Sequence, residues 1–128
     1  MFLKTAAVLC LTTLTACTDS DALEKVSLEQ ARIEHEGGKA LLIDIRERRE
    51  HLTGVAQGAM LLPMSELAQR QSLIPKNPDQ PVLLICNTQN RSKATWDALK
   101  KQGYQNVKNL RGGIDAWSLE VDQAVPRY

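Results

Sequence analysis

Two short apolar runs constrain the fold of this chain more than any other feature of its sequence. The first run, residues 40–45, reads A-L-L-I-D-I, and the second, residues 82–85, reads V-L-L-I. A strand with one face in water alternates apolar and polar residues, whereas a continuous apolar run is typical of a strand buried on both faces. Both runs therefore predict inner strands of a parallel sheet.

Helical segments are expected between the strands. Ser27 and Gln30 fit a capping box that starts a helix over residues 28–36. Ala94, Thr95, Ala98 and Leu99 recur at helical spacing and predict one apolar helix face. The remaining expected elements are a first strand at Val26, strands at 59–62 and 107–110, helices at 48–52 and from 65 to about 71, and a last helix containing Trp117. This alternation favours an α/β fold, with a mainly parallel sheet of about five strands and helices on both faces.

The composition fits one ordinary globular domain. The chain has 128 residues, of which 43% are hydrophobic. Its 16 basic and 15 acidic residues are not grouped into a basic block, so we expect no binding to nucleic acid. A domain of this size can work alone, and we expect a monomer.

The first residues are typical of an export signal. Lys4 precedes an apolar run over residues 5–14, which is shorter than the roughly 20 residues that a membrane-spanning helix needs. The sequence L-T-A-C at 14–17 resembles the lipobox of bacterial lipoproteins, so we expect cleavage after Ala16 and lipid on Cys17. An ordinary signal peptide cut nearby, or a buried N-terminal helix, remains an alternative.

This interpretation divides the chain into a signal peptide (1–16), a tether (17–24), a domain (25–120) and a C-terminal tail (121–128). It places the protein in the bacterial cell envelope, facing the periplasm and held to a membrane through lipidated Cys17. Position 18 is not aspartate, which slightly favours the outer membrane over the inner one.

Cys86 would be the only free thiol of the exported protein, because Cys10 lies in the signal and Cys17 carries lipid. Cys86 directly follows a buried strand, at the end where open parallel sheets bind ligands. Backbone N–H groups of residues 87–92 and the start of the next helix would favour a thiolate or a persulfide anion there. The alternative is a small buried side chain that merely ends a strand.

Three stretches of the sequence, taken together, resemble the rhodanese family. Residues 44–50, D-I-R-E-R-R-E, are similar to the family's D-x-R-E-x-x-E. Residues 86–92, C-N-T-Q-N-R-S, resemble its C-x-x-G-x-R-S loop, and residues 110–117, L-R-G-G-I-D-A-W, resemble its L-x-G-G-I-x-x-W ending. Gly54 and Gly58-Ala59 match further family positions, and the resemblance covers nearly all of residues 25–117.

The resemblance implies a rhodanese-like sulfurtransferase or sulfur carrier. Cys86 would take sulfur from a small donor such as thiosulfate and pass it to a thiol or to cyanide. The loop that holds the anion would comprise Asn87, Thr88, Gln89, Asn90, Arg91 and Ser92. Arg91 would add positive charge or brace the loop by pairing with Asp44, while Asp44 and Arg46 would fix strand ends. No cofactor and no metal site are expected.

The loop also departs from the family pattern. Four residues separate Cys86 from Arg91, where related phosphatases use five, and the tighter loop favours sulfur over phosphate. Gln89 replaces the usual glycine, so we expect either a different curve or a strained backbone. A non-catalytic binding module is therefore the main alternative function. A thiol redox or arsenate-reducing role is disfavoured because no second free cysteine would remain.

Overall fold

The computed structural model describes residues 25–125. The predicted signal peptide, the lipid on Cys17, the tether and the last three residues of the tail lie outside this range. Within it, no helix is both long enough and apolar enough to pass through a bilayer.

The core of the described region is a parallel sheet of five strands, as the sequence predicted. All of its pairs are parallel, in the order β1-β5-β4-β2-β3. Its strands are β1 (Lys25–Val26), β2 (Leu41–Asp44), β3 (Met60–Leu61), β4 (Val82–Ile85) and β5 (Val107–Leu110). The two apolar runs thus form β2 and β4, which pair directly with each other inside the sheet.

The helices follow the strands in alternation. They are α2 (Leu28–Glu36), α3 (Arg48–His51), α4 (Leu67–Arg70), α5 (Asn90–Lys101) and α6 (Gly113–Glu120), with 3-10 turns at Met64–Glu66 and Gln71–Leu73. The helix expected from Ser65 to about residue 71 is therefore broken into three short turns. Ser27 caps α2 as predicted, since its side chain accepts from the Gln30 N–H at 3.2 Å.

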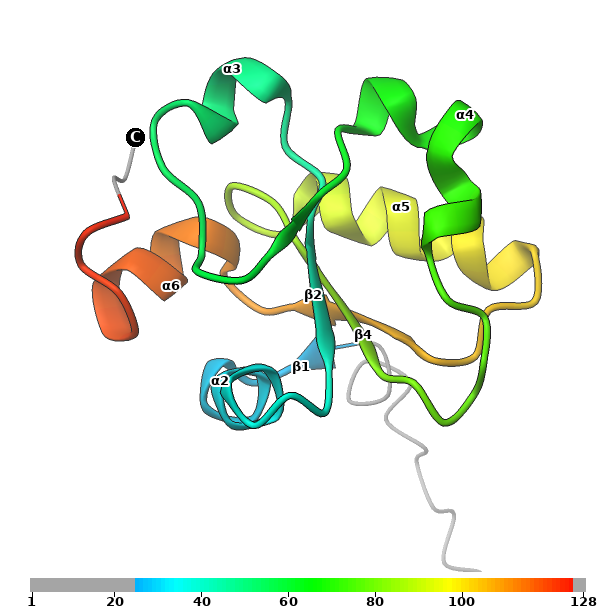
Figure 1. Ribbon diagram of the computed structural model, residues 1–128, viewed down its shortest axis with the longest axis horizontal. Helices are drawn as coiled ribbons and strands as arrows, with labels where there is room; N and C mark the ends of the chain where they lie inside the picture. Colours follow the sequence, from blue (N-terminus) through cyan, green and yellow to red (C-terminus); the bar gives the residue numbers. More distant parts are fainter. Residues whose placement is uncertain (1–24, 126–128) are drawn as a thin grey trace, which may run out of the picture.

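Helices cover both faces of the sheet (Figure 1), and each face has its own apolar cluster. Side chains of a strand alternate between the faces. Leu83 therefore packs against residues of α2 and α6, whereas Leu84 packs against residues of α5 and the α4 region. Both leucines are fully buried, which stabilises the fold by about 1.5–3 kcal/mol for each side chain.

The predicted apolar face of α5 is only half right. Thr95 and Leu99 are buried, but Ala94 and Ala98 are exposed. Ser92 joins the buried face instead, because it lies one helical turn before Thr95. Periodicity located the helix correctly, and the structure shows that its first buried position is polar.

The parallel strands bring two segments of the sequence to one edge of the sheet. Asp44, which ends β2, lies in register with Ile85, which ends β4. The segment leading to α3 and the turn leading to α5 therefore begin side by side (Figure 1). Ligands of open parallel sheets bind at this edge.

Candidate active site

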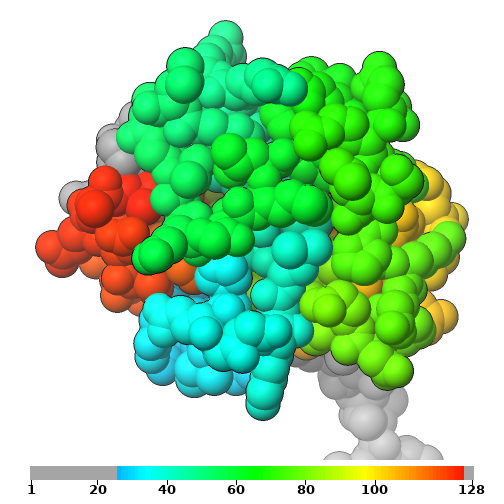
Figure 2. All heavy atoms as spheres, viewed as in Figure 1, coloured from blue at the N-terminus to red at the C-terminus, as the bar shows by residue number. Residues whose placement is uncertain are grey.

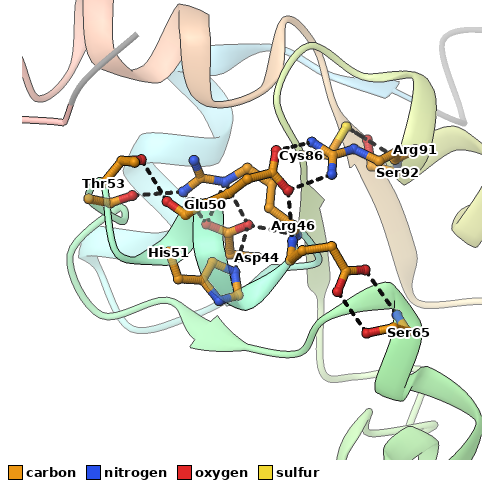
Figure 3. Close-up of polar contacts among 11 residues, drawn as sticks. Asp44, Arg46, Glu50, His51, Thr53, Ser65, Cys86, Arg91 and Ser92 are labelled. Carbon is orange, nitrogen blue, oxygen red and sulfur yellow. Dashed lines mark hydrogen bonds and ion pairs between the residues drawn. The ribbon is translucent and has the colours of Figure 1, made fainter. Parts of the chain in front are cut away.

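Cys86 lies where the sequence places it, directly after β4. Its Sγ accepts a hydrogen bond from the Ser92 N–H at 3.3 Å and lies 3.3 Å from the Ser92 Oγ (Figure 3). The turn between β4 and α5 therefore closes on the sulfur, and the first turn of α5 supplies the amide. Cys86 is nonetheless only 1% exposed and packs in the apolar cluster on the α5 side.

The last helix shapes this turn from behind. At the start of α6, the Ile114 N–H donates to the Cys86 carbonyl at 2.7 Å, and the Asp115 N–H donates to the Asn87 carbonyl at 3.1 Å. These are N–H groups that a helix start leaves without intrahelical partners. In a trans peptide the carbonyl and the following N–H point in opposite directions. The N–H groups of Asn87 and Thr88 therefore point away from α6.

Gln89 does not adopt the strained backbone that its replacement of glycine suggested. Its φ is −177°, and no residue other than glycine has a positive φ within residues 25–125. Instead, the Gln89 Oε1 accepts from the Gly112 N–H at 3.2 Å, while its carbonyl accepts from the Ser92 Oγ at 3.0 Å. The Gln89 side chain therefore connects the turn between β4 and α5 to the segment that precedes α6.

The expected pairing of Arg91 with Asp44 is wrong. Arg91 forms a two-pronged ion pair with Glu50, in which its Nη1 and Nη2 each donate to one carboxylate oxygen at 2.7 Å. Glu50 lies on α3, and its Oε2 also accepts from the Glu47 N–H, which completes a capping box at the start of that helix. Glu50 belongs to the D-x-R-E-x-x-E pattern, so the motif marked Glu50 as a site residue but did not identify it as the partner of Arg91.

Asp44 is held instead by Arg46, and both side chains are fully buried. The Arg46 Nη2 donates to Asp44 Oδ2 at 2.7 Å and to the Gly54 carbonyl at 2.8 Å. The His51 Nε2 lies 3.4 Å from the Asp44 Oδ1, beyond good hydrogen-bond geometry. This buried pair therefore links the end of β2 to the loop after α3, close to the Glu50–Arg91 pair (Figure 3).

A family model for the rhodanese-like domain matches residues 27–120, which is most of the chain. This chain belongs to the rhodanese-like family. A protein of Allochromatium vinosum called a sulfurtransferase is 44% identical to it over 78 residues, or 61% of this chain and 71% of that protein. An uncharacterized protein of Bacillus subtilis is 40% identical over 83 residues, and the match covers 65% of this chain and 64% of its relative.

Solved structures share the rhodanese-like fold. A human single-domain sulfurtransferase superposes with a TM-score of 0.66 at 29% identity, covering 75% of this chain and 96% of that one. A rhodanese-like domain protein from Staphylococcus aureus superposes with a TM-score of 0.68 at 21% identity, covering 82% of this chain and 98% of that one. Both solved chains match this chain over nearly their whole length.

The other loop residues of this rhodanese-like domain differ in exposure. Thr88 and Asn90 are exposed, whereas Asn87 is half-buried and Ser92 is fully buried. Asn109 on β5 also belongs to the site, because its side chain bonds the Ser92 Oγ. The sequence analysis missed Asn109. The available signal was its position as a polar residue inside a short strand. No group of three His, Cys, Asp or Glu residues suited to a metal occurs between residues 25 and 125.

Gly113 lets α6 approach the turn between β4 and α5 closely. A Cβ at this position would lie 2.5 Å from the carbonyl oxygens of Cys86 and Thr88, and the φ of Gly113 is +60°. We expect Gly113→Ala to lower the free energy of unfolding by about 2–5 kcal/mol. The added methyl group would clash with the turn, and alanine would have to adopt a left-handed backbone conformation. Urea denaturation measures this loss.

Gly38→Ala is the matched control for this substitution. Gly38 has a φ of +72°, but nothing lies within 4 Å of an added Cβ. Its alanine variant should therefore show only the cost of the left-handed backbone, about 1–2 kcal/mol. Equal losses in the two variants would show that the close approach of α6 to the turn contributes nothing.

Glu66, at the end of the 3-10 turn Met64–Glu66, is a carboxylate shared by two arginines. Hydrogen bonds from Arg48 and Arg70 lower the pKa of Glu66 from 4.5 to about 2. Because the folded pKa is depressed, this stabilisation is present above pH 4.5 and is lost as the pH falls toward 2. We expect an NMR titration of the Glu66 carboxyl carbon to show a midpoint near 2, and near 4.5 in an Arg48→Ala, Arg70→Ala double variant.

Proposed function

We propose that this protein is a sulfurtransferase or sulfur carrier that passes sulfane sulfur through a persulfide on Cys86. One observation carries the proposal: the Sγ ends a buried parallel strand and accepts the Ser92 N–H at 3.3 Å, in a turn whose carbonyls bond to α6. The Ser92 N–H and the positive end of α5 would both stabilise the persulfide anion of the proposed intermediate. The likeness to a protein called a sulfurtransferase supports the same chemistry.

The proposed reaction has two displacement steps. In the first, the Cys86 thiolate attacks the outer sulfur of a donor such as thiosulfate. A new S–S bond forms while the old one breaks, and its electron pair leaves with sulfite. In the second, a thiolate or cyanide attacks the outer sulfur of the persulfide. The products are a persulfide of the acceptor, or thiocyanate, and the regenerated Cys86 thiolate.

The side chains around the sulfur would have distinct roles. The Ser92 N–H would hold the anion in both steps, because it donates to Sγ directly. Arg91 would act as a positioning residue, since both of its terminal nitrogens donate to Glu50. Asp44 and Arg46 would support the site from the interior of the domain, because both side chains are fully buried.

Access to the sulfur requires the turn to move. Cys86 is 1% exposed, so a donor cannot reach Sγ while the turn keeps this conformation. Thr88 on the turn and Asn90 at the start of α5 are both exposed, so their side chains would lose little packing if the turn moved. Once formed, a persulfide places its outer sulfur about 2 Å beyond Sγ, closer to the acceptor.

Intact mass spectrometry tests this function. The full chain with Cys10 and Cys17 replaced by serine keeps Cys86 as its single thiol. After incubation with thiosulfate or a polysulfide, we expect a mass gain of one sulfur atom that cyanide removes. Alkylation of Cys86 before the donor is added should prevent the gain.

A non-catalytic binding module is the second candidate function. The burial of Cys86 and the bond from Gly112 to the Gln89 side chain favour it, because both keep the turn closed. No mass gain with any donor, in a chain whose Cys86 alkylates only after unfolding, would support the binding module and contradict sulfur transfer.

We further propose that the protein acts in the bacterial cell envelope as a lipoprotein. The L-T-A-C sequence at 14–17 supports this location. In cells, the wild-type chain should sediment with membranes and incorporate labelled palmitate. Replacing Cys17 by serine should abolish the label, and a label that persists would contradict lipid attachment at this residue.

A further inference from the structure

A hollow of about 700 Å³ opens on the side of α3 that faces away from Arg91. Its wall includes residues of α3, of the edge strand β3 and of α4, which lie side by side on the face shown in Figure 2. We name this feature the arginine hollow, after the three arginines that line it: Arg48, Arg49 and Arg70.

The arginine hollow has an excess of positive charge. Arg48 and Arg70 share a single carboxylate, that of Glu66. Arg49 is exposed and forms no ion pair with any residue between 25 and 125. The three guanidinium groups thus exceed the one carboxylate that pairs with them, and this excess of positive charge attracts a negatively charged partner.

Exposed apolar side chains lie among these charges. Leu52 is 89% exposed and Leu61 is 37% exposed, and both line the hollow together with Pro63. A leucine left this open gains about 25 cal/mol for each Å² of apolar surface that a partner covers. The hollow thus combines apolar anchors with a basic rim, which is the usual anatomy of a protein-docking surface.

The hollow is also next to the turn between β4 and α5, which contains Cys86. Glu50 of α3 holds Arg91 at the start of α5, while its neighbours Arg49 and His51 line the hollow. The two features are thus separated by one helix, about 10 Å across. A partner seated in the hollow therefore lies beside the turn that begins at Cys86.

We propose that the arginine hollow docks the sulfur acceptor, and that this acceptor is a protein whose thiol is flanked by acidic residues and an apolar side chain. This inference rests on the proposed function, because it assumes that Cys86 delivers sulfur. The acidic residues pair with the rim, and the apolar side chain covers Leu52 and Leu61. The partner's thiolate then attacks the outer sulfur, and the Cys86 thiolate leaves.

A single-turnover experiment on the full chain tests the proposal, with Cys86 as the single thiol. The probes are a synthetic peptide with a cysteine among glutamates and one leucine, the same peptide with lysines for the glutamates, and cyanide. We expect the acidic peptide to remove the sulfur at least about tenfold faster than the lysine peptide at low salt. Arg49→Glu should abolish this preference, and Leu52→Ser should slow the acidic peptide, while both variants react normally with cyanide.

Matched controls lie on the opposite end and side of the domain. Lys39→Glu reverses an exposed charge before β2, and Ile33→Ser removes an apolar side chain of α2 that is 50% exposed. Neither should change the rates with either peptide. Equal rates for the two peptides, or control variants as damaging as Arg49→Glu and Leu52→Ser, would overturn the proposal.

A binding measurement separates docking from chemistry. The acidic peptide with serine in place of cysteine should bind the unloaded chain, by fluorescence anisotropy, and Arg49→Glu should weaken binding at least about tenfold. If Cys86 fails to load sulfur, the proposed function is contradicted, but the peptide should still bind. If the peptide does not bind, only the docking proposal is contradicted. A dimer broken by Leu52→Ser, or binding to phosphatidylglycerol vesicles through Arg49, would assign the hollow to a second copy or a lipid surface instead.

Discussion

Cys86→Ser is expected to abolish sulfur loading from every donor and to stop thiocyanate production from cyanide. A serine hydroxyl is a far weaker nucleophile than a thiolate at neutral pH, and it cannot hold sulfur as a persulfide. The surroundings of Sγ would accept the smaller oxygen, because its hydrogen-bond partners are the N–H and Oγ of Ser92. The activity should therefore fall to the rate without protein, while the fold persists.

Stability measurements distinguish a chemical loss from a structural one. Cys86 is 1% exposed and packs in an apolar cluster, so we expect Cys86→Ser to lower the free energy of unfolding by about 1–2 kcal/mol. Urea denaturation and the initial rate of thiocyanate formation report on the two properties separately. A folded Cys86→Ser protein that still forms thiocyanate would remove Cys86 from the reaction.

Asp44→Ala is expected to destabilise the protein by about 3–5 kcal/mol, because it removes one partner of a buried ion pair. Asp44 accepts from the Arg46 Nε and Nη2 and from the Arg46 backbone N–H, and neither side chain is exposed. In the variant, the Arg46 guanidinium would keep its hydrogen bond to the Gly54 carbonyl but would lose the Asp44 carboxylate. This loss is a large share of the 5–15 kcal/mol that holds a typical domain together.

Two further variants make the measurement of this pair decisive. Asp97→Ala removes an exposed carboxylate that lies 3.4 Å from the Lys93 Nζ, and it should cost less than about 1 kcal/mol. Asp44→Asn keeps the shape of the side chain and should remain folded enough for a denaturation curve if the alanine variant does not. An Asp44→Ala loss no larger than that of Asp97→Ala would mean that the buried pair does not support this edge of the sheet.

The architecture could be predicted from the sequence because its signals are local. Continuous apolar runs predicted the bounds of β2 and β4 almost correctly, and the capping box predicted the start of α2. Where the signal was weak, the prediction was weaker. Residues 64–73 form three short turns, since no sustained apolar period fixes one helix there.

The partners within the site could not be predicted in the same way. Arg91 and Glu50 are 41 residues apart, and nothing local to either one selects the other over Asp44. The sequence left open whether Gln89 would change the curve of the loop or strain its backbone, and its φ of −177° excludes the strained, left-handed conformation. A motif identifies which residues meet at one edge of a sheet, but the pairing among several charges depends on side-chain packing.

Because α6 is hydrogen-bonded to the turn between β4 and α5, this turn is not an independent module. Amides from the last helix hold the carbonyls of Cys86 and Asn87, and Gly113 leaves no room for a side chain between them. Grafting residues 86–92 alone into another α/β scaffold would transplant a sequence without the backing that bends it. The segment around residues 112–115 must be transplanted with it, so these two distant stretches would have to change together for the loop to diverge.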